Sequence, residues 1–129
     1  MKQKKSEELG LFLFLSFFLD KLLIIHYSYN MKKTIYTLAQ IKKLLFPIFA
    51  EYHIKKAILF GSYAKNCAVP NSDVDILVDS GLRGLAFFGL LESVAEALDK
   101  NVDLLDVSQV IPNSQVDKEI QNTGIMIYG

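Results

Sequence analysis

Two short apolar segments, separated by a polar loop, constrain the fold of this chain more than any other feature. The first, Ala57–Phe60, is continuous and stops at Gly61-Ser62, which is typical of a strand buried on both faces. The second, Val74–Val78, begins within the acidic sequence Asp73-Val74-Asp75. The pattern predicts two buried strands with polar residues at the junctions, so the chemistry of the chain is expected at those junctions.

The rest of the chain alternates helical and strand periodicities. We expect a helix over about Leu38–Tyr52, a helix over 85–99, a strand over Val102–Val107, a helix that Pro112 opens and Gly124 ends, and a last strand over Ile125–Tyr128. Because Pro47 lies inside the first helix, we expect a kink or a break near Leu45 and Phe46. The fold class that follows is α/β (α+β), with a single mixed β-sheet flanked by helices.

Residues 1–30 differ from the remainder. Leu9–Leu19 forms an apolar run behind several lysines, but it is too short to span a bilayer and lacks the cleavage site of a signal peptide. Met31 resembles an alternative start. We therefore expect residues 1–30 to be an extension outside the working domain and residues 31–129 to form that domain, with a membrane-binding or partner-binding helix as the alternative for the extension.

Composition excludes some functions. The chain has 129 residues, enough for one domain, and its 14 Lys and Arg balance its 14 Asp and Glu. Stable nucleic-acid binding is not expected without a broad basic surface, so any phosphate chemistry must be local. A single cysteine, Cys67, forms no intramolecular disulfide and no zinc cluster, which favours a reducing, cytoplasmic location; membrane association is not expected.

The Gly61-Ser62 junction suits an anion. Glycine after a strand lets a phosphate approach the backbone closely, and the Ser62 hydroxyl and the amides of a following helical turn can donate to it. By itself the dipeptide is weak evidence, because Gly-Ser after a strand is more often an ordinary turn.

Three acidic residues are the candidate metal ligands. Asp73 and Asp75 share a strand face and repel each other unless a cation lies between them, and their oxygen atoms suit Mg²⁺. The alternative is a solvated strand entrance with capping aspartates. Asp103 lies in an otherwise apolar strand, where an unpaired charge is costly. If that strand adjoins the other, three carboxylates converge opposite the Gly-Ser turn, as two-metal phosphoryl transfer requires.

Other candidates have simpler interpretations. Asp106 competes with Asp103 for the third acidic position, but the spacing places the two on opposite strand faces and Asp103 lies deeper in the apolar run. We interpret Asp79 as a turn cap, Cys67 as a structural thiol, and His53 as a residue that favours a helix dipole.

Together these residues resemble a known family. Gly61-Ser62, ten intervening residues, Asp73-Val74-Asp75 and a later acidic strand are similar to the nucleotidyltransferases of the DNA-polymerase-β-like superfamily. The small size resembles their minimal branch, the antitoxin partners of HEPN ribonuclease toxins. The resemblance covers residues from about 38 to 128.

The resemblance implies an activity and a role for each motif residue. Gly61, Ser62 and Lys65 would bind the nucleotide phosphates, Asp73 and Asp75 would bind two Mg²⁺ ions, and Asp103 would complete the second metal site and assist the nucleophile. AMP would pass from ATP to a hydroxyl, which in the antitoxin branch is a tyrosine of the HEPN toxin.

One departure from the family pattern leaves alternatives open. Family members commonly read Gly-Ser-aromatic-Ala-Arg-Gly, whereas this chain has Lys65-Asn66 in the last two places. Lysine keeps the positive charge of arginine but lacks the guanidinium group that binds a phosphate through two hydrogen bonds, and asparagine can still adopt positive φ. The alternatives are a non-catalytic antitoxin that neutralises by binding alone, and a nucleotidyltransferase for a small molecule, which usually needs a further substrate domain.

Overall fold

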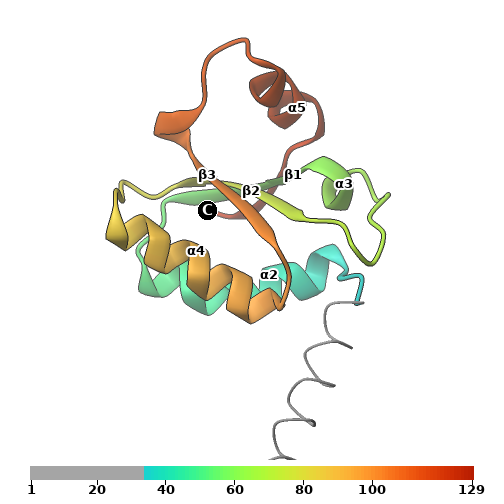
Figure 1. The fold of residues 1–129 in the computed structure, drawn as a ribbon, viewed down its shortest axis with the longest axis horizontal. Helices are drawn as coiled ribbons and strands as arrows, with labels where there is room; N and C mark the ends of the chain where they lie inside the picture. Colours follow the sequence, from blue (N-terminus) through green and yellow to red (C-terminus); the bar gives the residue numbers. More distant parts are fainter. Residues whose placement is uncertain (1–33) are drawn as a thin grey trace, which may run out of the picture. The chain divides into compact units, whose positions relative to one another are not determined.

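A four-stranded sheet covered by helices on both faces forms the domain (Figure 1). The computed structural model describes residues 34–129, so the expectation for residues 1–30 and for Met31 falls outside the described residues. The elements are α2 (Leu38–Glu51), β1 (Lys56–Phe60), α3 (Gly61–Ala64), β2 (Val74–Asp79), α4 (Leu85–Leu98), β3 (Val102–Asp106), the 3-10 helix η1 (Val107–Gln109), α5 (Gln115–Thr123) and β4 (Ile125–Tyr128). The predicted α+β fold is confirmed.

The sheet order is β3-β2-β1-β4. β1 pairs antiparallel with both β2 and β4, whereas β2 and β3 are parallel. A parallel pair needs a crossover connection, and α4 provides it between β2 and β3. The register brings Asp75 opposite Asp103 on one side and opposite Phe60 on the other.

Two helices, α2 and α4, cover one face of the sheet, and α5 lies over the other (Figure 1). The larger core lies between the sheet and α2 and α4, and includes the fully buried Phe49, Leu59, Ile76 and Leu90. A smaller cluster of Phe60, Leu77 and Ile120 packs beneath α5. The sheet is therefore buried on both faces, which is why its central strands have almost continuous apolar sequences.

Helix α2 confirms the predicted capping box and excludes one of the two outcomes expected at Pro47. The side chains of Thr37 and Gln40 form a reciprocal capping box at its start, as their spacing indicates. A break at Pro47 does not occur, because α2 continues through it to Glu51, and a kink there stays a prediction. Proline has no amide proton, so the carbonyl of Lys43, four residues before Pro47, loses its helical donor. Both residues are exposed, so water can bond to that carbonyl.

Helix α5 begins three residues later than Pro112 predicts. Asn113 has φ of +64°, which interrupts a helical path, and Ser114 then caps the helix by accepting a bond from the Asp117 amide. Pro112 therefore belongs to the turn before the helix. Within residues 34–129, none of the helices has the length and apolar character needed to cross a membrane.

Candidate active site

The site is built around the junction of β1 and α3. Gly61 is the first residue of α3 and has φ of +72°, a conformation that other residues adopt only with strain. A Cβ atom at this position would overlap the carboxylate of Asp75. Gly61 is thus required twice, once by its backbone conformation and once by the carboxylate that lies against it.

The turn after Gly61 keeps its shape despite the unusual sequence. Ser62 follows within α3 and its carbonyl accepts a bond from the Cys67 amide at 3.0 Å. Asn66 has φ of +58°, the conformation that the sequence predicts for an asparagine replacing glycine. The substitution therefore leaves the turn intact.

Asp75 and Asp103 lie side by side on the parallel strands β2 and β3. Burial raises the pKa of Asp75 to about 7, and a hydrogen bond shared with Asp103 and the negative charge of that residue add to the effect. Glu119 and Asp73 contribute smaller charge effects of the same sign. The geometry thus concentrates negative charge beside Gly61.

Asp73 occupies a less enclosed position. It is exposed and lies in the loop immediately before β2, close enough for its charge to raise the pKa of Asp75. In the part of the chain that the structure describes, no three His, Cys, Asp or Glu side chains are grouped closely enough to hold a metal ion. The structure brings Asp75 and Asp103 together, and the convergence of Asp73 with them stays a prediction.

Glu119 is a site residue that sequence reasoning missed. It projects from α5, lines a groove of about 430 Å³ beside Asp75 and Asp103, and pairs with Lys65, whose Nζ lies 3.2 Å from Glu119 Oε1. On a polar helix such as α5, a glutamate carries no sequence signal that separates it from a solvated one. Only the packing of α5 against α3 and β1 brings it to the site.

Asp106 has a structural role at the end of β3. It is buried and accepts bonds from the backbone and hydroxyl groups of both Ser80 and Ser108. Burial opposes its ionisation, but these bonds outweigh burial and lower the pKa of Asp106 to about 2. Ser80, bonded to Asp106, also accepts from the Leu82 amide and so stabilises the turn after β2, whereas the capping role of Asp79 stays a prediction.

The chemistry of the site suits a hard divalent cation. All the acidic side chains around Asp75 offer oxygen atoms, the ligands that Mg²⁺ prefers. Asp75 ionises only against burial and three neighbouring negative charges, so a cation there would relieve both the repulsion and the desolvation cost. Asp75 and Asp103 therefore fit Mg²⁺ as part of a ligand set, because this ion is usually bound by one or two carboxylates together with substrate phosphates and water.

Comparison with known proteins places this geometry in a family. The model described as "Polymerase beta, Nucleotidyltransferase" matches residues 43–129. Two proteins of Methanocaldococcus jannaschii, each named "Putative protein adenylyltransferase", are similar to the chain. One is 37% identical over 76 residues, covering 57% of this chain and 81% of that protein. The other is 33% identical over 97 residues, covering 70% and 98%.

Solved structures agree with these sequence relatives. A chain in the crystal structure of a toxin–antitoxin with AMP-PNP superposes with a TM-score of 0.58 and 28% identity, covering 68% of this chain and 73% of that chain. A structure of the tri-AMPylated Shewanella oneidensis HEPN toxin in complex with MNT antitoxin gives a TM-score of 0.55 at 24% identity, covering 72% and 73%. The second likeness concerns the fold alone.

Proposed function

Because the chain belongs to the polymerase-beta nucleotidyltransferase family, we propose that it transfers AMP from ATP to a hydroxyl group of a partner protein and releases pyrophosphate. The partner is a HEPN-type toxin, the acceptor is one of its tyrosines, and the chain acts as its antitoxin in the cytoplasm. Relatives named as protein adenylyltransferases support the reaction, and the toxin–antitoxin structure with AMP-PNP supports the partner and the nucleotide.

The observation that carries this proposal is the placement of Asp75 and Asp103. They are paired across β2 and β3 and share a hydrogen bond, and the carboxylate of Asp75 lies against the backbone of Gly61. Packing alone gives no reason to bring two carboxylates together at a partly buried position, since their repulsion destabilises the fold. A cation and a phosphate explain both features.

Each residue then has a task. The backbone of Gly61 and the Ser62 hydroxyl hold the phosphates. Lys65 leaves its ion pair with Glu119 and binds a phosphate oxygen instead. Asp73, Asp75 and Asp103 would hold Mg²⁺, which would supply charge neutralisation at the phosphates and lower the cost of deprotonating the acceptor. Asp103, exposed on the edge strand β3, accepts the proton of the incoming hydroxyl.

The test is transfer to the protein encoded beside this one. The purified pair is incubated with ATP and Mg²⁺, and intact-mass spectrometry measures the addition of AMP to the partner. We expect addition with wild-type protein, none with EDTA, and a loss of orders of magnitude with Asp75→Asn. Asp79→Asn is the matched control, because it removes a carboxylate from the same strand outside the site.

The same experiment distinguishes a catalytic antitoxin from one that neutralises the toxin by binding alone. Its support was the Lys65-Asn66 departure, and the intact turn at Asn66 weakens that support. If Asp75→Asn still suppresses the toxin's ribonuclease activity without adding AMP, binding alone neutralises the toxin and the catalytic proposal is wrong.

A further inference from the structure

Lys100 is a buried lysine that the reaction above does not use. Only 7% of its surface is exposed, and burial lowers its pKa. Taking an ammonium group out of water is costly, so a lysine is rarely retained at such a position for stability alone. Its contacts therefore indicate what it is kept for.

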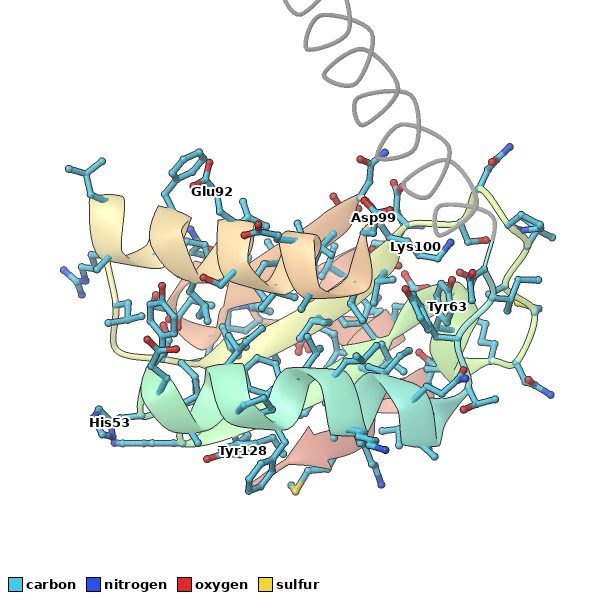
Figure 2. The ribbon with its side chains drawn as sticks, turned by 90° about the horizontal axis from the view of Figure 1, so that it is seen from below. His53, Tyr63, Glu92, Asp99, Lys100 and Tyr128 are labelled. Atoms are coloured by element: carbon cyan, nitrogen blue, oxygen red, sulfur yellow. The ribbon has the colours of Figure 1, made fainter. Side chains whose placement is uncertain are left out.

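The ammonium group joins two segments that are distant in sequence. Lys100 Nζ donates to the Pro70 carbonyl at 3.0 Å and lies 5.9 Å from the centre of the Tyr36 ring. The Tyr36 hydroxyl donates in turn to the Leu98 carbonyl at 2.7 Å, at the end of α4. Figure 2 shows Lys100 at the same end of the domain as Tyr63 of α3.

Pro70 belongs to the loop that carries Asp73. Val69 and Ser72 close a tight turn around it, through the Ser72 amide to the Val69 carbonyl and the Val69 amide to the Ser72 hydroxyl, both at 2.9 Å. Asp73 follows directly. On the other side of Lys100, the Asn101 carbonyl accepts from the Val74 amide at 3.0 Å, where β3 begins beside β2.

We propose that Lys100 is a positioning residue, which holds the turn at Pro70 against the start of β3 so that Asp73 is directed toward Asp75 and Asp103. The inference rests on the proposed function, because it assigns Asp73 to the metal site. Asp73 lies in the exposed stretch between the turn at Pro70 and the start of β2, whereas Asp75 and Asp103 lie within paired strands. Of the three proposed ligands, Asp73 is therefore the one whose position depends most on an anchor outside the sheet, such as this bond.

The test compares Lys100→Met, which keeps the length of the side chain and removes the donor, with Lys100→Arg, which restores a donor. Binding of AMP-PNP is titrated calorimetrically at a series of Mg²⁺ concentrations. We expect Lys100→Met to raise the Mg²⁺ concentration for half-maximal binding about tenfold, the loss of one bond from a charged donor, and Lys100→Arg to recover much of it.

A double-mutant cycle with Asp73→Ala distinguishes positioning from general stability. If Lys100 acts through Asp73, the double variant needs no more Mg²⁺ than Asp73→Ala alone. In metal-free protein, amide exchange of residues 66–73 should accelerate in Lys100→Met while that of α2 and β1 is unchanged.

Two results would overturn the inference. Additive losses in the cycle, or an unchanged Mg²⁺ requirement in Lys100→Met, would show that Lys100 only supports the fold. Wild-type protein that fails to bind AMP-PNP with Mg²⁺ would instead refute the proposed function, and this inference with it, so the two failures are distinct.

Discussion

Replacing Asp75 with asparagine should stabilise the metal-free protein while abolishing transfer. Folded protein holds a proton on Asp75 up to a pH of about 7, and that protonated form shares a hydrogen bond with Asp103. Asparagine has nearly the same shape and can donate the same bond without carrying charge. The substitution therefore fixes the side chain in a form close to its protonated state.

The magnitude and its pH dependence follow from the pKa. A rise from 3.8 to about 7 corresponds to roughly 4 kcal/mol at most, and solvent screening of this half-buried group reduces the gain to about 1–2 kcal/mol. A raised pKa means that the folded state holds the proton more tightly, so wild-type stability falls as pH rises from about 4 to 7. The gain of Asp75→Asn is thus absent below pH 4, grows through this range and is complete above pH 7.

Thermal unfolding in EDTA, monitored by circular dichroism at a series of pH values, measures this gain. For a domain of this size we expect the variant to melt about 5–15 °C above wild type at pH 8 and at the same temperature below pH 4. Asp79→Asn should change stability by no more than about 0.5 kcal/mol. Saturating Mg²⁺ should stabilise wild type more than Asp75→Asn, because the variant lacks one anionic ligand.

The reasoning fails if Asp75→Asn melts below wild type at pH 8, or if its gain does not depend on pH. The first result would mean that Asp75 is held by partners that favour its charge. The second would mean that the gain comes from packing. Neither is compatible with a carboxylate whose burial and neighbours oppose its ionisation.

Three further predictions concern other parts of the domain. Gly61→Ala should lower the free energy of unfolding by about 1–3 kcal/mol and weaken AMP-PNP binding, because the φ of Gly61 is strained for alanine and the added Cβ meets Asp75. Melting curves and calorimetry measure the two effects, and wild-type values for both would contradict the prediction. Asp106→Asn should lower the free energy of unfolding in urea by about 2 kcal/mol above pH 4. This loss should shrink as pH falls toward 2, because wild-type Asp106 then becomes protonated, and a loss that does not depend on pH would refute the charge assigned to Asp106. Deleting residues 1–30 should leave the melting temperature and nucleotide affinity unchanged, since residues 36–127 supply the described core, and a large fall in either would show that the extension is integral.

Local sequence patterns predicted most of the fold, whereas the site depends on how the strands pair. The apolar runs placed Asp75 and Asp103 in two separate strands, and the two residues meet because β2 and β3 pair in parallel with Asp75 opposite Asp103, a condition that the sequence left open. The start of α5 was less predictable. Its position depends on the positive φ of Asn113, which competes with the helix-opening tendency of Pro112.

Residues that act through tertiary packing left no local signal. Glu119 reaches the site only because α5 packs over β1, and Lys100 is buried although lysines usually mark the surface. The contact between Gly61 and Asp75 likewise depends on the pairing of β1 with β2. Sequence spacing indicated that these two residues act together, but not that one leaves no room for a side chain on the other.

The parallel pairing of β2 with β3 also bears on how the domain acquires its structure. β1 and β2 follow each other along the chain and pair antiparallel, whereas β3 can join them only after α4 has crossed the sheet. Contacts that close longer loops form more slowly, so Asp75 and Asp103 meet late in folding. We therefore expect their repulsion to slow the docking of β3, and a proton or a magnesium ion that removes the repulsion to speed it. The side chains proposed to hold the metal would then also limit how quickly a newly made chain reaches its native state.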